Sequence, residues 1–236
     1  MGLLWADRFL LPSGARRRFL IAFWLWYAVA AVWFVGMMNT WEAIWPVSLC
    51  LVWWLVLFFR EPLQRFTAWL RLPLFLKFLL LGLFFNDVVM ENLAVSFKGD
   101  LHPNLFLNCF LWLGPYAGVL VGWWLLARFY SFSPWLVFLL YGIKGVIIEQ
   151  DFLVAKLLLS KQFLAVAVFI PIVAVVYGAS VAPVFVALEK ELPRPPRRLG
   201  LLGPVLAIGV PALLFYGFAF AWFKLVALIF GLKIGA

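Results

Sequence analysis

Long hydrophobic segments alternate with short polar ones along almost the whole chain. A membrane-spanning helix needs about 20 mostly apolar residues, and seven segments come close to that length. The longest polar stretch, residues 189–198, consists mainly of charges and prolines, which end helices and prefer water. We therefore predict an all-α polytopic integral membrane protein with about seven transmembrane helices, at residues 19–36, 44–59, 73–97, 104–127, 134–158, 162–188 and 201–230.

Composition supports the membrane assignment and limits the number of domains. The chain is 67% hydrophobic and only 12% charged, whereas soluble domains average about 45–50% apolar and about 25% charged residues. No polar linker divides the hydrophobic part. We predict one transmembrane domain at residues 19–236, preceded by a basic amphipathic cytoplasmic segment at residues 1–18.

The net charge of +9 follows the hydrophobic pattern rather than indicating a nucleic-acid partner. If the N-terminus is cytoplasmic, most of the 19 basic residues fall in cytoplasmic segments, as the positive-inside rule requires. The external segments then hold only Lys98, Lys156, Lys161 and Lys233. We predict a cytoplasmic N-terminus, an external C-terminus and a bacterial or archaeal cell membrane, with membrane lipids as partners.

Small residues repeat every fourth position in two of the predicted helices. Such stripes let helix backbones approach closely, so we expect these two helices to be central. Dimerisation or assembly into a larger membrane complex through the same stripes is the alternative. The residues are Gly114, Gly118 and Gly122 in one helix, and Ala174, Gly178 and Ala182 in the other.

Tryptophan is abundant, with 14 residues, and several lie near predicted helix ends. An interfacial aromatic belt explains that placement, and an aromatic-lined cavity for an apolar or cationic ligand is the alternative. The residues concerned are Trp41, Trp45, Trp69, Trp123, Trp124 and Trp135.

Five ionisable residues stand inside two of the predicted helices, where unpaired charge is costly and usually marks a functional site. Asp87 and Glu91 are four residues apart, so they share one face of an α-helix. Lys144 and Asp151 are seven apart and share a face of the next such helix, from which Glu149 points away. Glycines at 142 and 145 make a local break in that helix plausible.

Helical rise places these residues at similar depths. At about 1.5 Å per residue, the acids lie in the outer half of the bilayer and Lys144 lies near the midplane. We predict catalytic roles for Asp87, Glu91, Lys144, Glu149 and Asp151, and substrate-binding roles for Asn86, His102, Asn108 and Gln150. The alternative is that Lys144 pairs with Asp87 or Asp151 and only orients the helices.

The chain lacks the residues that several kinds of active site require. A single histidine cannot provide two axial haem ligands or a histidine-rich metal site. The chain contains no GxSxG, HExxH or phosphate-binding GxxxxGK[ST] motif, and it indicates no particular cofactor and no metal.

Three functions remain open at this stage. The first is a membrane-embedded enzyme that acts on a lipid or isoprenoid-like substrate, with a buried carboxylate as general acid or base. The second is a small proton- or cation-coupled transporter that uses the same carboxylates as a relay. The third is a non-catalytic subunit of a larger membrane complex, in which the acids pair with a partner.

Overall fold

The computed structural model describes residues 13–38, 44–90, 105–149, 153–193, 195 and 202–230. Every regular element within these ranges is a helix, which confirms the all-α prediction there. The α-helices are α1 (Ser13–Met38), α2 (Ile44–Phe58), α3 (Arg60–Trp69), α4 (Leu74–Leu83), α6 (Leu105–Phe129), α7 (Pro134–Lys144), α8 (Leu153–Leu159), α9 (Phe163–Ala187) and α10 (Leu202–Phe230). Two π-helical segments, η2 (Phe84–Val89) and η3 (Gly145–Glu149), continue α4 and α7.

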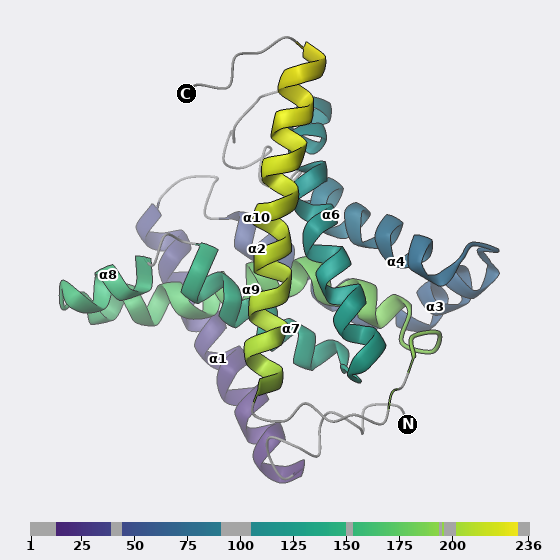
Figure 1. Ribbon diagram of the computed structural model, residues 1–236. Helices are drawn as coiled ribbons and strands as arrows, with labels where there is room; N and C mark the ends of the chain where they lie inside the picture. The colour runs from purple at the N-terminus through teal and green to yellow at the C-terminus, as the bar shows by residue number, and fades with distance from the viewer. Residues whose placement is uncertain are drawn as a thin grey trace.

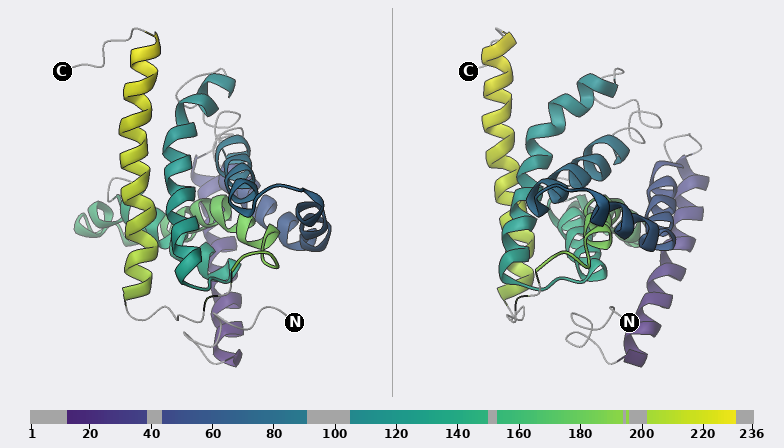
Figure 2. Two further views of the ribbon diagram at one scale, coloured as in Figure 1. Left: turned by 45° about the vertical axis from the view of Figure 1, so that its right-hand side comes forward. Right: turned by 90° about the vertical axis from the view of Figure 1, so that its right-hand side faces the viewer.

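Helix α9 forms the centre of the molecule. It packs against α1, α2, α3, α4 and α7, and 61% of its most hydrophobic stretch is buried, against 11% for α10. Helices α6 and α10 lie side by side, and α9 crosses them (Figures 1 and 2). Because α9 and α10 run crosswise, they cannot both have the tilt of about 20° from the membrane normal that is usual for membrane spans.

The small-residue stripes form contacts within the chain, as expected. A Cβ atom at Gly122 would stand 2.7 Å from the Cα of Pro211, so this glycine brings α6 against the backbone of α10. A Cβ atom at Gly178 would stand 2.7 Å from the carbonyl oxygen of Phe138, which brings α9 against α7. Close backbone approach at both places depends on the absence of a side chain.

The number of candidate spans differs from the sequence prediction. Three helices, α6, α9 and α10, are long and apolar enough to cross a membrane, and α2 with α3 makes a fourth if that bent pair counts as one span. The apolar stretches Leu20–Gly36 and Pro134–Ile148 are shorter. Seven full-length spans are therefore not found among the described residues.

Helix α3 was not predicted, and its start explains the end of α2. The two helices are bent by 71° at Phe59. Pro62 has no N–H to donate to the carbonyl of Phe58, so α2 cannot continue, but proline is tolerated in the first turn of the new helix. The sequence prediction placed no helix at residues 60–72, between the helices expected at 44–59 and 73–97.

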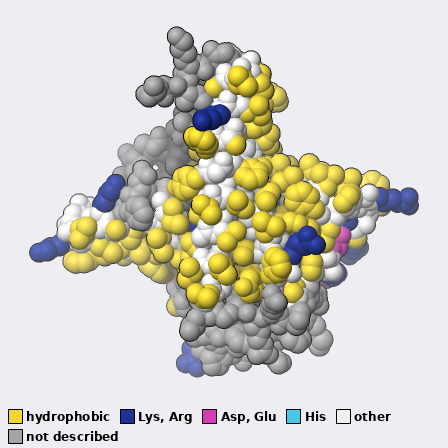
Figure 3. All heavy atoms as spheres, in the orientation of Figure 1, with side chains coloured by type: hydrophobic (Ala, Val, Ile, Leu, Met, Phe, Trp, Pro, Cys, Tyr) yellow, Lys and Arg dark blue, Asp and Glu magenta, His cyan; other side chains and the backbone are white. Residues whose placement is uncertain are grey.

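The outer surface is largely hydrophobic, as Figure 3 shows for one face. Large apolar side chains such as Phe58, Phe106 and Leu228 are each 80% exposed. Contiguous apolar surface of this kind is rare on soluble monomers, and it fits a helical protein surrounded by lipid. Among the tryptophans assigned to the predicted aromatic belt, Trp69 is 75% exposed, whereas Trp123 is fully buried against Phe185 and so cannot face a membrane interface.

Candidate functional site

The structure buries every predicted site residue whose side chain it describes. Asn86 and Asp87 lie on η2, Asn108 lies on α6, and Lys144 ends α7. Their exposed fractions are 1%, 3%, 0% and 1%. Glu149 ends η3, where only its backbone is described, and Glu91, His102, Gln150 and Asp151 lie outside the described residues.

The first polar group lies where η2 contacts α6. In η2 the Met90 N–H donates to the carbonyl oxygen of Phe85, five residues earlier, which is the hydrogen bond of a π-helix. The thiol of Cys109 on α6 lies 3.8 Å from the main-chain oxygen of Asp87 and donates to it. The wider turn thus presents a backbone carbonyl to the neighbouring helix, beside the buried Asn108.

Asn86 is the most unusual member of this group. Neither its amide nitrogen nor its amide oxygen has a hydrogen-bond partner among the described residues, although both atoms are buried. A buried unpaired polar group costs about 1–3 kcal/mol, and most such groups in folded proteins find partners. The described part of the structure therefore leaves the buried amide of Asn86 without compensation, and a bound polar group would supply it.

The second polar group surrounds Lys144 with aromatic rings. The Lys144 ammonium lies 4.8 Å from the ring centre of Tyr141 on α7, 5.8 Å from that of Tyr177 on α9 and 5.2 Å from that of Phe215 on α10. Electrons on the ring faces attract a cation at such distances, and more strongly when water is excluded. Lys144 is therefore held at the junction of α7, α9 and α10 by a cage of aromatic side chains.

A stripe of α6 connects the two groups. Asn108 and Trp112 are four residues apart on α6, so they share a face of that helix. Trp112 stacks on Phe215 with their ring centres 6.3 Å apart, and Phe215 lies beside the Lys144 ammonium. Two half-buried aromatic rings therefore lie between the groups on η2 and α7.

The π-helical segments change the helical phase that was assumed from the sequence. The shared face of Lys144 and Asp151 depends on a continuous α-helix, but η3 follows Lys144 directly. The predicted break near Gly145 takes this form: α-helical hydrogen bonding gives way to π-helical bonding at that residue. Likewise Asp87 lies within η2, so its expected same-face pairing with Glu91 has no α-helical basis. A wider turn rotates every following residue relative to the preceding helix.

The two π-helical segments also share a sequence pattern that the helix-by-helix interpretation missed. Residues 88–92 read Val-Val-Met-Glu-Asn, and residues 146–150 read Val-Ile-Ile-Glu-Gln. Their glutamates are 58 residues apart, and so are the starts of α6 and α9, which are each 25 residues long. Pro115-x-x-Gly-x-x-x-Gly in α6 resembles Pro171-x-x-Ala-x-x-x-Gly in α9, but these two motifs are 56 residues apart. Glu91 and Glu149 occupy corresponding positions in the two short stretches that share the pattern.

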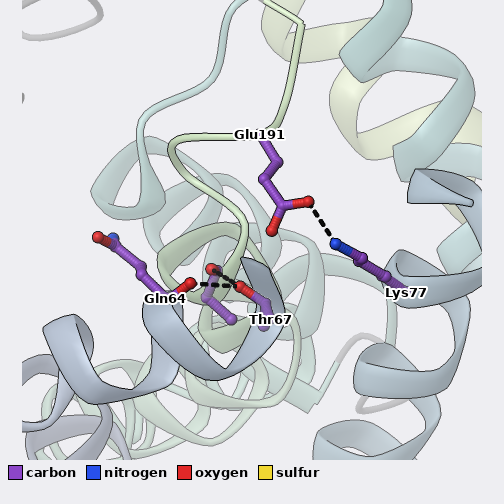
Figure 4. Close-up of polar contacts among 5 residues, drawn as sticks. Gln64, Thr67, Lys77 and Glu191 are labelled. Atoms are coloured by element: carbon purple, nitrogen blue, oxygen red, sulfur yellow. Dashed lines mark hydrogen bonds and ion pairs between the residues drawn. The ribbon is translucent and has the colours of Figure 1, made fainter. Parts of the chain in front are cut away.

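A separate polar cluster at the end of α9 was also missed (Figure 4). Gln64 and Thr67 on α3 donate to the carbonyl oxygens of Val186 (2.9 Å) and Ala187 (3.0 Å). These carbonyls belong to the last turn of α9 and have no partners within that helix. The Lys77 ammonium on α4 lies 2.7 Å from a carboxylate oxygen of Glu191. The cluster joins three segments that the charge pattern had assigned to one side of the membrane.

Within the described ranges, no three His, Cys, Asp or Glu side chains converge in a way that could hold a metal ion. No known protein family, no curated protein and no solved structure matches the chain. The candidate functional site, formed by the buried polar residues on η2, α6 and α7, is therefore identified from its geometry alone.

Proposed function

We propose that this protein is a membrane-embedded enzyme that acts on a lipid or isoprenoid-like substrate. The observation that carries the proposal is the buried amide of Asn86, which has no hydrogen-bond partner among the described residues. It lies beside Asp87 in a π-helical turn of an apolar interior. π-helical turns are rare and often occur at functional sites. An apolar substrate with one polar group would bury its chain among hydrophobic side chains and offer hydrogen bonds to Asn86.

In this proposal Asp87 is the general acid or base. A carboxyl group in an apolar interior can exchange a proton with a substrate held within hydrogen-bond distance. Asn86 and Asn108 bind the polar part of the substrate, with Gln150 and His102 as further binding residues. Glu91 and Glu149, which share a local sequence pattern, have equivalent roles in the proposal, and Asp151 and Lys144 balance the charge that develops during proton transfer.

The proposed setting is the cell membrane, crossed several times, with the N-terminus cytoplasmic and the C-terminus external. The polar cluster of Gln64, Thr67, Lys77 and Glu191 supports one part of this topology, because it gathers segments predicted to be cytoplasmic. A reporter that works only outside the cytoplasm should be active when it is fused after Ala236. A C-terminus found in the cytoplasm, together with a cytoplasmic N-terminus, would require an even number of crossings.

The enzyme proposal is tested by comparing apolar metabolites in cells that express the wild type, Asp87→Asn or Asn86→Leu. We expect the wild type to change the abundance of at least one lipid species, Asp87→Asn to bind that substrate without converting it, and Asn86→Leu to bind it poorly. Mass spectrometry of extracts from membranes and from purified protein measures both effects. Thr67→Val is the matched control, since Thr67 is a buried polar residue outside the site.

If the wild type and Asp87→Asn give identical lipid profiles and retain the same species, the enzyme proposal is wrong. Two further measurements then separate the remaining functions. Proton or cation flux in proteoliposomes that disappears in Asp87→Asn supports a coupled transporter. Stoichiometric co-purification of another membrane protein, without flux, supports a subunit of a larger complex.

A further inference from the structure

An apolar groove of about 510 Å³ runs between α1 and the start of α9, away from the candidate site. Trp33 and Phe34 of α1 form one wall, and Ala165 and Phe169 of α9 form the other. Val168, which is 8% exposed, forms the floor. The volume lies within the range of about 300–1,000 Å³ that is usual for ligand clefts.

The walls of this groove are fixed to each other on both helices. The indole N–H of Trp26 on α1 donates to the carbonyl oxygen of Ala167 on α9, at 2.7 Å. The rings of Phe34 and Phe169 meet edge to face, with their centres 5.9 Å apart. The groove is therefore a preformed part of the α1–α9 interface and not a gap between independent helices.

Lys161 stands at the mouth of the groove in an unusual backbone conformation. Its φ is 59°, and it is the one described residue other than glycine with positive φ. Its N–H donates to Leu158 and the N–H of Gln162 donates to Leu157, which is the Schellman ending of a helix. Glycine is usual at this position because a Cβ is strained there. A lysine that persists at a strained position suggests a functional reason.

The side chain of Lys161 is exposed, and none of the ion pairs within the described ranges involves it. Basic side chains lie at the end of the α8–α9 hairpin beside hydrophobic ones, at the left of Figure 3. A cation next to an apolar groove and a tryptophan is complementary to a molecule with an anionic head and a hydrocarbon chain.

We propose that this groove binds an anionic phospholipid. One acyl chain lies along Val168 and Phe169, and the phosphate contacts the ammonium of Lys161 and the amide of Gln162. None of the residues that line this groove is among the proposed catalytic or substrate-binding residues, and the lipid site does not depend on the enzyme proposal.

Native mass spectrometry of the purified full chain tests the site with phosphatidylglycerol and phosphatidylcholine that carry the same acyl chains. We expect the wild type to prefer phosphatidylglycerol and Lys161→Gly to lower its affinity for that lipid about fivefold, since each basic residue near a membrane surface contributes about that factor. Phosphatidylcholine binding should be unchanged. Lys161→Gly keeps the fold because glycine suits the positive φ, and Lys161→Arg should retain the preference.

Two controls separate the groove from general attraction of basic residues to anionic lipid. Lys156→Gln removes one charge from the same hairpin but outside the groove lining, so phosphatidylglycerol binding should stay within twofold of the wild type. Ala165→Phe fills the groove and should weaken both lipids. The proposal is wrong if Lys156→Gln loses as much affinity as Lys161→Gly, or if both lipids bind the wild type equally. It is also wrong if Ala165→Phe, folded by circular dichroism, binds both as the wild type does.

Discussion

Replacing Asn86 by leucine should make the protein more stable while removing its proposed ligand. The side chain is 1% exposed, and both of its polar atoms lack hydrogen-bond partners among the described residues. Leucine has the same number of side-chain heavy atoms and the same branch point as asparagine but no polar atom, so the substitution removes the amide without leaving a cavity. Most substitutions of buried residues are destabilising, which makes a gain of stability at this position a sharp test.

The expected gain follows from the cost of the unpaired amide. In a water-soluble protein that cost is about 1–3 kcal/mol. In detergent the unfolded chain also keeps many residues in an apolar environment, and hydrogen bonds between membrane helices are worth only about 0.6 kcal/mol on average. We therefore expect Asn86→Leu to raise the free energy of unfolding by about 0.5–2 kcal/mol.

Unfolding in mixed micelles of increasing sodium dodecyl sulfate, followed by the fluorescence of the 14 tryptophans, measures this difference. Thr67→Val serves as the control of opposite sign. Thr67 is equally buried, but its hydroxyl donates to the carbonyl oxygen of Ala187 at 3.0 Å, so its loss should cost about 0.5–1.5 kcal/mol. If Asn86→Leu destabilises the protein as Thr67→Val does, then Asn86 has a structural partner in the fold and the argument for a ligand fails.

Three further substitutions test other parts of the structure. Lys77→Met leaves the carboxylate of Glu191, which lies 2.7 Å from the Lys77 ammonium and is 26% exposed, without its partner. Unfolding in mixed micelles should show a loss of stability of about 2–3 kcal/mol, which a second substitution, Glu191→Leu, should largely restore. Equal losses in Lys77→Met and in the double variant would contradict this. Gly122→Ala places a Cβ 2.7 Å from the backbone of α10 and should lower the thermal midpoint in detergent, whereas Gly209→Ala, with open space around its Cβ, should leave it unchanged or raise it. Lys161→Gly should stabilise the protein by about 1 kcal/mol in the same unfolding assay, because it relieves the strain of a Cβ at φ 59°; a loss of stability would show that the lysine side chain packs structurally.

The hydrophobic pattern predicted the positions of most helices because lipid or protein must cover each apolar segment. The expected helices at 19–36, 44–59, 104–127, 162–188 and 201–230 correspond to α1, α2, α6, α9 and α10. Helix length and direction were harder to predict. Composition shows that a segment avoids water, but contacts such as those around Gly122 and Gly178 decide which helix crosses which. The crosswise placement of α9 was therefore not accessible from the pattern.

Polar side chains that satisfy backbone groups were the main omission. Gln64 and Thr67 occupy a stretch that looked like a connection, and their partners are main-chain carbonyls more than a hundred residues away. A main-chain carbonyl has no signature in a sequence, so no motif could have indicated these hydrogen bonds. Lys77 was assigned to a cytoplasmic segment by its charge, but its burial and its pairing with Glu191 depend on how the chain returns after α9.

The cost of burying polar groups was enough to predict the residues of the candidate site, but it could not predict how they are arranged. A charged or amide side chain in an apolar helix needs a partner or serves a function, so it is expected to face the protein interior. The sequence prediction was correct for the four described residues of this kind, which are all buried: Asn86, Asp87, Asn108 and Lys144. The phase arguments assumed continuous α-helices, whereas both polar segments contain π-helical turns, which the α-helical rule of three and four residues does not describe. The same-face pairings of Asp87 with Glu91 and of Lys144 with Asp151 stay predictions, because Glu91 and Asp151 lie outside the described residues.

Both π-helical turns lie close to the short sequence pattern that occurs twice. η2 ends two residues before Glu91 and η3 ends at Glu149, and both segments pack against α9. The shared pattern makes Glu91 the counterpart of Glu149 in the proposed site. If the two glutamates are equivalent, Glu91→Gln and Glu149→Gln should impair the proposed lipid conversion to similar extents in the same mass-spectrometric assay. A variant pair in which only one substitution has an effect would assign the chemistry to one of the two glutamates.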